Sequence, residues 1–184
     1  PYIAKDFPQM VELWDRIGGE QVRNMGTIGG NVANGSPIGD TPPALIALGA
    51  KVVLRKGGKR RSVALEDFFI AYGKQDRALG EFIESVEIPY LPEGDRFAVY
   101  KVTKRFDEDI TAVCGAFRIS LDKSGKVKNA CLAFGGMAAT PKRAKLTEAA
   151  LIGKVWSEES VEEAIACFSK DFTPLTDMRA TAQY

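Results

Sequence analysis

The chain has 184 residues, of which 45% are hydrophobic and 27% are charged, a balance typical of a globular protein with a buried core. Its 25 basic and 24 acidic residues leave a net charge of +1, which argues against a partner bound mainly through phosphate neutralisation, such as duplex DNA. It contains no histidine, so any chemistry must come from carboxylates, amines, backbone dipoles or a bound cofactor, and no zinc site of the usual kind is expected.

Near the N-terminus, apolar residues recur at helical spacing and predict a helix over 8–17 that the following glycines end. A long loop follows, in which four glycines and several small polar residues lie from Gly26 to Gly35. An apolar helix then starts, with Thr41 as its N-cap, and ends at Gly49. Such a loop either turns a corner or brings its backbone unusually close to another group.

The rest of the first half predicts a hairpin, a helix and a strand. Strand-forming residues on both sides of Gly57-Gly58 predict a hairpin over 51–65, and its basic tip is interpreted as a solvated turn rather than a nucleic-acid patch. Residues 66–74 predict a short helix, and residues 81–90 predict a strand. The segment 91–95, "LPEGD", is the best linker in the chain, and we place a domain boundary there.

A different pattern follows the linker. Three strand candidates are followed by two amphipathic helices, at residues 96–105, 111–122, 127–138, 143–153 and 157–172. Gly125 lies in the turn between the last two strands, where a positive φ is expected. Ser157, ahead of two glutamates, begins the last helix. This order predicts an antiparallel sheet with helices on one face, and an α+β fold for the whole chain.

The three cysteines, Cys114, Cys131 and Cys167, lie far apart in apolar contexts. They form neither a C-x-x-C metal pair nor a closed disulfide set, so we expect buried, reduced thiols. Reduced thiols are typical of cytosolic proteins, so a cytoplasmic location is expected. No apolar run approaches the roughly 18 residues that span a bilayer, and no signal peptide is recognisable. Because the chain begins at Pro1, we expect it to be part of a longer polypeptide.

The glycine loop admits a functional and an ordinary interpretation. The segment Thr27-Ile28-Gly29-Gly30-Asn31 would present successive N–H groups, an arrangement that binds anions. A plain loop with turn glycines explains the same composition. The segment lacks the Gly-Lys-Ser/Thr ending of a P-loop, and it lacks the preceding strand and the glycine spacing of a Rossmann fingerprint. The residues alone therefore indicate either a phosphate-bearing ligand held by backbone groups or a simple turn.

A longer pattern favours the functional interpretation. Residues 27–50, "TIGGNVANGSPIGDTPPALIALGA", resemble the flavin-binding signature of the molybdenum hydroxylase flavoproteins, and in particular the FAD-carrying part of the xanthine dehydrogenases. The most specific element is "GGN-x-x-x-x-SP-x-x-D", which ends at Asp40. The resemblance continues in four further segments, 85–90, 100–110, 132–144 and 177–184. It therefore covers essentially the whole chain.

The resemblance implies a fold and a cofactor. It places the second half of a PCMH-type FAD-binding domain in residues 1–92. A domain like the C-terminal domain of the CO dehydrogenase flavoproteins, a small antiparallel sheet with helices on one face, follows in residues 96–184. The cofactor-binding residues that it implies are Ile17, Thr27, Ile28, Gly29, Gly30, Asn31, Asp40, Ile83 and Lys101. It assigns no catalytic side chain and no metal ligand.

The resemblance also implies a role for each of these residues. The main-chain N–H groups of residues 27–31 would face the pyrophosphate of FAD. Asp40 matches a carboxylate that we expect to accept hydrogen bonds from donors on the cofactor. Ile17 and Ile83 match apolar contacts, although the family often has an aromatic residue at the place of Ile17. Lys101 is expected close to the isoalloxazine ring.

The implied activity is electron transfer, in which FAD takes electrons from iron–sulfur clusters and passes them to NAD+ while hypoxanthine or xanthine is oxidised. The 2Fe–2S clusters and the molybdenum cofactor would lie on other domains or chains. The charged loop 104–110 would run beside the flavin and tune its potential, unless it is simply a solvated turn. The family's upstream half, with its own glycine-rich loop, has no counterpart before residue 24. We therefore expect the isolated chain to hold FAD weakly or not at all and to be inactive.

Two alternatives stay open. The chain could be the medium flavoprotein subunit of a carbon monoxide dehydrogenase or of an aromatic-acyl-CoA reductase type enzyme. It could also be a non-catalytic module that packs against partner subunits and no longer holds flavin. The sequence leaves open the substrate of the molybdenum site, the preference for NAD+ and whether the chain forms a homo-oligomer.

Overall fold

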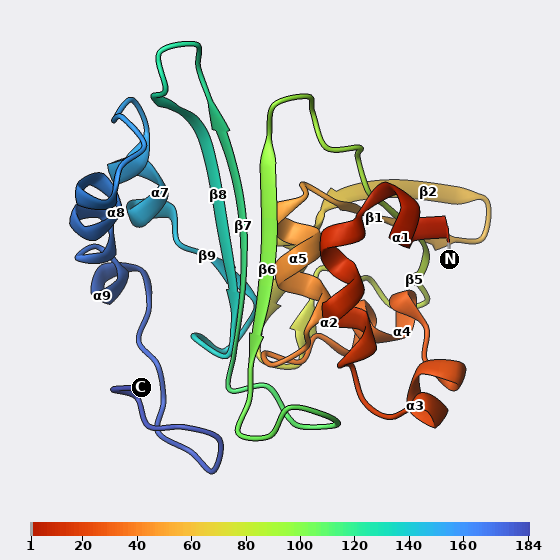
Figure 1. The fold of residues 1–184 in the computed structure, drawn as a ribbon. Helices are drawn as coiled ribbons and strands as arrows, with labels where there is room; N and C mark the ends of the chain where they lie inside the picture. The colour runs from red at the N-terminus through yellow and green to blue at the C-terminus, as the bar shows by residue number, and fades with distance from the viewer. Residues whose placement is uncertain (1) are drawn as a thin grey trace.

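A four-stranded antiparallel sheet, in the order β6-β7-β8-β9, lies at the centre of the computed structural model, which describes residues 2–184 (Figure 1). Its strands are β6 (Arg96–Val102), β7 (Val113–Leu121), β8 (Val127–Gly135) and β9 (Lys142–Arg143). Helix α5 packs on one face, and α7, α8 and α9 cover the other. These helices are α5 (Thr41–Ala47), α7 (Lys145–Leu151), α8 (Glu158–Ile165) and α9 (Phe168–Asp171). The α+β fold predicted from the sequence is confirmed.

A second sheet, in the order β2-β1-β5, lies beyond α5. Its strands are β1 (Lys51–Lys56), β2 (Lys59–Ala64) and β5 (Phe82–Glu87). Between β2 and β5 the chain forms α6 (Leu65–Phe68) and a two-stranded sheet of β3 (Phe69–Ala71) and β4 (Lys74–Gln75). The predicted hairpin is confirmed, with Lys56 opposite Lys59 and its glycine turn exposed to solvent.

Before α5 the chain forms short helical segments, drawn in red and orange in Figure 1. They are α1 (Tyr2–Asp6), the 3-10 turn η1 (Pro8–Met10), α2 (Val11–Asp15), α3 (Glu20–Met25) and α4 (Ile28–Asn34). The helix predicted over 8–17 is confirmed as η1 followed by α2, and its apolar residues Met10 and Leu13 are buried.

Alternation along the central strands explains why both faces of the main sheet are covered. On β7, Cys114 and Ala116 point toward α5, whereas Ile119 points toward the C-terminal helices. The side chains under α5 are small, so the helix lies close to the strands. On the opposite face, Phe134 makes edge-on contacts with three other rings, Phe117, Phe168 and Phe172. The helices predicted on one face are confirmed, and α5 from the first half covers the other face.

The helix predicted over 66–74 is wrong beyond Phe68. The next residues are mostly aromatic or β-branched, which favours extended backbone, and they form β3. Gly73, with a φ of 66°, turns the chain back into β4.

The last predicted helix, over 157–172, forms two helices instead of one. Ser157 caps α8 as predicted, because its hydroxyl accepts the N–H of Ser160 at 3.3 Å. The chain bends at Cys167, and Phe168 then packs edge-on against Phe134, with ring centroids 5.1 Å apart. The interruption therefore places the Phe168 ring against Phe134.

The cysteines are free thiols, as predicted; Cys114 and Cys131 are buried and Cys167 is half-buried. Burial raises the pKa of Cys114 to about 12 and that of Cys131 to about 11. Both thiols are therefore protonated at neutral pH. Among residues 2–184, no helix combines the length and the apolar character that a bilayer span requires.

Candidate functional site

The glycine-rich segment forms the start of α4 instead of a long loop. Thr27 caps this helix: its hydroxyl accepts the N–H of Gly30 at 2.9 Å, and its carbonyl accepts the N–H of Asn31 at 2.9 Å. The predicted row of free N–H groups is therefore wrong for these two residues. The N–H groups of Ile28 and Gly29 have no protein acceptor within the part of the chain that the structure describes.

The two adjacent glycines of α4 differ in their surroundings. A Cβ on Gly30 would lie 2.9 Å from the Thr27 hydroxyl, and Gly30 does not have the positive φ that a tight loop would require. The left-handed position is Gly35, whose φ of 61° ends the helix. A Cβ on Gly29 would meet only the Ile83 side chain, at 3.9 Å. The protein therefore leaves open space beside Gly29.

A cavity of about 470 Å³ lies beside the start of α4, a size typical of small-molecule sites. Four of the nine residues implied by the flavin signature line it, namely Ile17, Thr27, Ile28 and Asn31. Trp14 and Val22 extend its apolar wall, and Arg23 and Thr41 add polar groups. The arrangement therefore combines an apolar surface with polar groups on one side.

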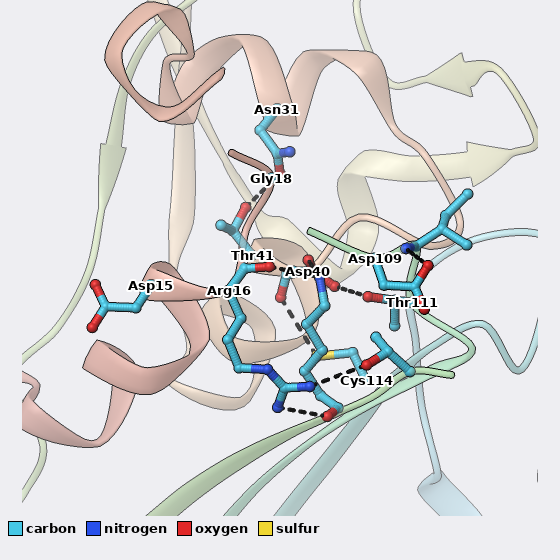
Figure 2. A network of polar contacts seen from close by, with 12 residues as sticks. Asp15, Arg16, Gly18, Asn31, Asp40, Thr41, Asp109, Thr111 and Cys114 are labelled. Atoms are coloured by element: carbon cyan, nitrogen blue, oxygen red, sulfur yellow. Dashed lines mark hydrogen bonds and ion pairs between the residues drawn. The ribbon is translucent and has the colours of Figure 1, made fainter. Parts of the chain in front are cut away.

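Asp40 and Lys101 form an ion pair, with Lys101 Nζ 2.7 Å from Asp40 Oδ2 (Figure 2). The other carboxylate oxygen of Asp40 accepts the Thr111 hydroxyl, and Lys101 also donates to the carbonyl of Arg16 at 3.1 Å. Both side chains of the pair are almost fully buried, with exposed fractions of 9% for Asp40 and 3% for Lys101. Asp40, expected to accept hydrogen bonds from the cofactor, thus has a protein donor on each carboxylate oxygen.

A side-chain hydrogen bond connects the cavity with this pair. The Thr41 hydroxyl donates to Asn31 Oδ1 at 2.5 Å, and Thr41 directly follows Asp40 in the chain (Figure 2). Cys114 Sγ lies 3.7 Å from the Asp40 carbonyl oxygen, so the thiol packs against the main chain of Asp40. The start of α5 is therefore the element that joins the two parts of the site.

Arg16, at the end of α2, holds the segment that follows β6. Its guanidinium donates to the carbonyl of Lys101 at 3.0 Å, to the Thr103 hydroxyl at 3.1 Å and to the carbonyl of Phe106 at 3.1 Å. It also lies 4.7 Å from the centroid of the Phe106 ring, within range of a cation–π contact. One side chain therefore attaches the first half of the chain to the charged loop.

The charged loop 104–110 has internal contacts of its own. Asp109 accepts the N–H of Arg105 at 2.7 Å and the N–H of Ile110 at 2.9 Å, and these hydrogen bonds lower the pKa of Asp109. Glu108 has a φ of 49°, an uncommon conformation for a residue other than glycine. The loop is therefore an ordered turn stabilised by its own carboxylate.

The structure brings some of the nine implied residues together and separates others. Asp40 and Lys101 are in direct contact, and Ile83 on β5 lies opposite Gly29. The wall of the cavity beside α4 does not include five of the nine, namely Gly29, Gly30, Asp40, Ile83 and Lys101. The pyrophosphate, ring and hydrogen-bonding roles that the resemblance implies for these residues stay predictions.

Sequence reasoning missed three residues in this region, Trp14, Arg16 and Arg23. Trp14 was assigned only to the apolar face of a helix, although it lines the cavity. The available sequence signal for Arg16 was its position directly before Ile17. Its hydrogen-bond partners, however, lie 85 to 90 residues later in the chain. Within residues 2–184, no cluster of histidine, cysteine and carboxylate side chains could hold a metal ion.

Comparison with protein families finds two matches along the chain. Residues 1–91 match the model for the FAD binding domain in molybdopterin dehydrogenase. Residues 98–184 match the model for the CO dehydrogenase flavoprotein C-terminal domain.

The individual relatives differ in how much of their own length this chain matches. The chain is 37% identical over 181 residues to a xanthine dehydrogenase of Dictyostelium discoideum, covering 90% of this chain but 13% of that protein. It is 35% identical over 182 residues to the glyceraldehyde dehydrogenase medium chain of Sulfolobus acidocaldarius, covering 99% of this chain and 64% of that protein. The fold matches a carbon monoxide dehydrogenase structure from Hydrogenophaga pseudoflava with a TM-score of 0.91 and 30% identity, covering 100% of this chain and 63% of that chain. The chain thus spans only part of each of these relatives.

Proposed function

Because the chain belongs to the flavoprotein family of the molybdenum hydroxylases, we propose that it forms the second half of the FAD site of a xanthine dehydrogenase. The complete enzyme would oxidise hypoxanthine or xanthine in the cytoplasm, with its iron–sulfur clusters and molybdenum cofactor on other domains or chains. FAD, when bound, supplies the flavin that accepts electrons from the clusters and passes them to NAD+. We assign residues 1–92 to the FAD-binding domain and 96–184 to the C-terminal flavoprotein domain, a division that the two family matches support.

The cavity beside α4 is the observation that carries this proposal. Its wall brings together four residues of the flavin signature, and the space beside Gly29 is open. Among the described residues, the N–H groups of Ile28 and Gly29 have no protein acceptor. Apolar walls next to unused donors fit a cofactor that carries both rings and phosphates.

Each polar contact around the cavity has a role in this proposal. Thr27 fixes the first turn of α4, so the N–H groups of Ile28 and Gly29 keep one orientation. The pair of Asp40 and Lys101 holds β6 against the start of α5. Because its two charges compensate each other, the pair would add little net charge near the isoalloxazine, where we place Lys101.

A second candidate is the separate medium flavoprotein subunit of a carbon monoxide dehydrogenase or aromatic-acyl-CoA reductase type enzyme. The observation that favours it is coverage: the match to the glyceraldehyde dehydrogenase medium chain covers 99% of this chain and 64% of that protein. The xanthine dehydrogenase match has similar identity, at 37% against 35%, so the sequence likeness supports both candidates. A module that packs against partner subunits without flavin is the third reading.

The complete enzyme separates these candidates by substrate. A xanthine dehydrogenase is expected to form NADH from NAD+ when hypoxanthine is added. Oxidation of carbon monoxide with an artificial acceptor, or reduction of an aromatic acyl-CoA with an artificial donor, but no activity with hypoxanthine, would support the second candidate instead. A complex that assembles with no flavin absorbance would support the packing module.

Gly29→Ala in the complete flavoprotein tests the site itself. The methyl group fits the protein, because the nearest side-chain atom, on Ile83, would be 3.9 Å away, but it enters the open space between Gly29 and Ile83, two residues that we propose contact the cofactor. We expect flavin content to fall while the melting temperature of the flavin-free protein stays unchanged. Gly58→Ala, at a hairpin position with nothing within 4 Å, is the matched control and should keep its flavin. Full flavin content in Gly29→Ala would contradict this location.

A further inference from the structure

The cavity beside α4 has an aromatic wall to which neither the flavin signature nor the family matches give a role. Trp14 is half-buried and lines the cavity together with Ile17 and Ile28. Among the described side chains that line this cavity, Trp14 is the only aromatic one. Its Nε1 atom is buried and has no hydrogen-bond partner within the described residues. The part of the indole that remains accessible is therefore carbon, a surface suited to stacking rather than hydrogen bonding.

The same cavity carries a positive charge that has no carboxylate partner. The Arg23 guanidinium lines the cavity and donates to two main-chain carbonyls, of Gly18 at 2.6 Å and of Asp15 at 3.0 Å. No carboxylate oxygen of residues 2–184 lies within 4.0 Å of it. The two carbonyls orient the guanidinium but leave its charge available to an anion.

We propose that Trp14 stacks against a planar heteroaromatic ring of the dinucleotide in this cavity, and that Arg23 binds the phosphate attached to that ring's sugar or ribityl chain. The inference rests on the proposed function and adds two residues to the site. An aromatic wall alone would suit many apolar ligands. An aromatic wall and an uncompensated arginine on one cavity of about 470 Å³ select a nucleotide.

FAD contains two such rings, adenine and isoalloxazine, and two pairs of ligands distinguish between them. ADP and adenosine represent the adenine end, and FMN and riboflavin represent the isoalloxazine end. The chain has only two tryptophans, Trp14 and Trp156, so the two indole N–H signals in a ¹H–¹⁵N spectrum can be assigned with Trp14→Phe and Trp156→Phe. Millimolar ligand makes weak binding to the 184-residue chain visible as a change in chemical shift.

We expect the Trp14 signal to shift with one ligand pair, and the Trp156 signal to stay in place because Trp156 lies on a different surface, beside β6 and β7. A shift with the ADP pair assigns the adenine end to the cavity, and a shift with the FMN pair assigns the isoalloxazine end. Either result supports the proposal.

Substitutions separate the roles of the two residues. Trp14→Ala, followed through the backbone signals of residues 27–31, should weaken both members of the binding pair about tenfold, the effect of losing one stacked ring. Trp14→Phe should retain most of the affinity, which guards against a variant that simply fails to fold. Arg23→Gln should weaken the phosphorylated member about tenfold and the unphosphorylated member less than about twofold. Arg77→Gln, in the turn between β4 and β5, is the control and should change neither, because Arg77 does not line the cavity and donates to the carbonyl of Glu81.

Two results would overturn the inference. If FAD shifts the backbone signals of residues 27–31 but not the Trp14 indole, the ring lies elsewhere and the proposed function stands. If no ligand shifts any signal at millimolar concentration, Trp14 and Arg23 do not bind a nucleotide in this chain. The flavin content of the complete enzyme, which does not depend on the Trp14 signal, then decides the proposed function separately.

Discussion

The two faces of the central sheet are held by different kinds of contact. Against the C-terminal helices, the sheet is covered by a cluster of apolar side chains centred on Phe134. Against the first half of the chain, a larger apolar cluster that includes Leu45 and Leu48 is accompanied by a buried ion pair, Asp40 with Lys101, and by the hydrogen bonds of Arg16. The candidate site lies entirely on the second side.

The difference matters because apolar contacts and polar contacts contribute to the structure in different ways. Apolar burial is roughly proportional to area and has no direction, so it stabilises a fold without fixing individual groups. Hydrogen bonds and ion pairs require particular partners at particular angles. The apolar contacts on both faces therefore supply stability, and the polar contacts around Asp40 and Arg16 supply the geometry of the site.

The largest effect is expected from the apolar face. Phe134→Ala removes a buried ring that contacts three others, and a loss of about 4 kcal/mol in the free energy of unfolding is expected. Chemical denaturation measures it. Phe82→Ala, at a residue that is 53% exposed, is the control and should cost less than about 1 kcal/mol. Equal losses in the two variants would show that the Phe134 cluster contributes little to stability.

Lys101→Met tests the polar side. The substitution leaves the Asp40 carboxylate buried without its cation, and we expect the free energy of unfolding to fall by about 3 kcal/mol. Adding Asp40→Asn removes the uncompensated charge, so the double variant should recover part of this loss. If the double variant is as unstable as the sum of the single variants, the two side chains are energetically independent and the comparison between the two faces fails.

The elements of regular structure could be predicted where periodicity is strong. The hairpin around Gly57-Gly58 and the strands after residue 95 follow from alternating apolar residues, and the structure has them. Helix α4 was missed because its glycines and asparagines have low helix propensity. Ile28 and Val32, four residues apart, were the signal: Val32 is fully buried and Ile28 packs on the same core.

The site could be predicted only where a linear pattern marks it. The signature containing Thr27 and Asp40 is contiguous, so it was recognisable. The partners of Asp40 lie 61 and 71 residues later in the chain, and no local pattern predicts such pairs. The cavity wall formed by Trp14 is also a consequence of tertiary packing, because the same helical spacing predicts an ordinary core residue.

A smaller effect is expected from Asp171, a buried carboxylate among the C-terminal helices. Its carboxylate accepts the N–H of Leu146 at 2.9 Å and both the N–H and the hydroxyl of Thr147 at 2.8 Å. Burial acts to raise its pKa, but these hydrogen bonds outweigh burial and lower the pKa. Asp171→Asn should therefore cost about 1.5 kcal/mol at pH 7.

The pH dependence of this variant has a defined sign. A carboxyl group whose pKa is lower in the folded state stabilises the protein above its unfolded pKa of about 3.9, and the contribution is lost as pH falls through the folded value. The difference between the parent chain and Asp171→Asn, measured by urea unfolding, should therefore shrink below about pH 4. A difference that stays constant from pH 7 to pH 3 would mean that the carboxylate charge is not what stabilises this contact.

The smallest effect is expected at Thr27, and it tests whether the two faces unfold together. Thr27→Ala removes the cap of α4, which should cost about 1 kcal/mol, whereas Thr27→Ser keeps the capping hydroxyl and should cost much less. Hydrogen exchange of the backbone amides shows which part of the structure loses stability. Because α4 lies on the polar side, the amides of Gly30 and Asn31 should exchange faster while those of β7 and β8 keep their protection. Equal acceleration throughout the sheet would instead make the chain one cooperative unit, in which the start of α4 cannot be altered without weakening the core.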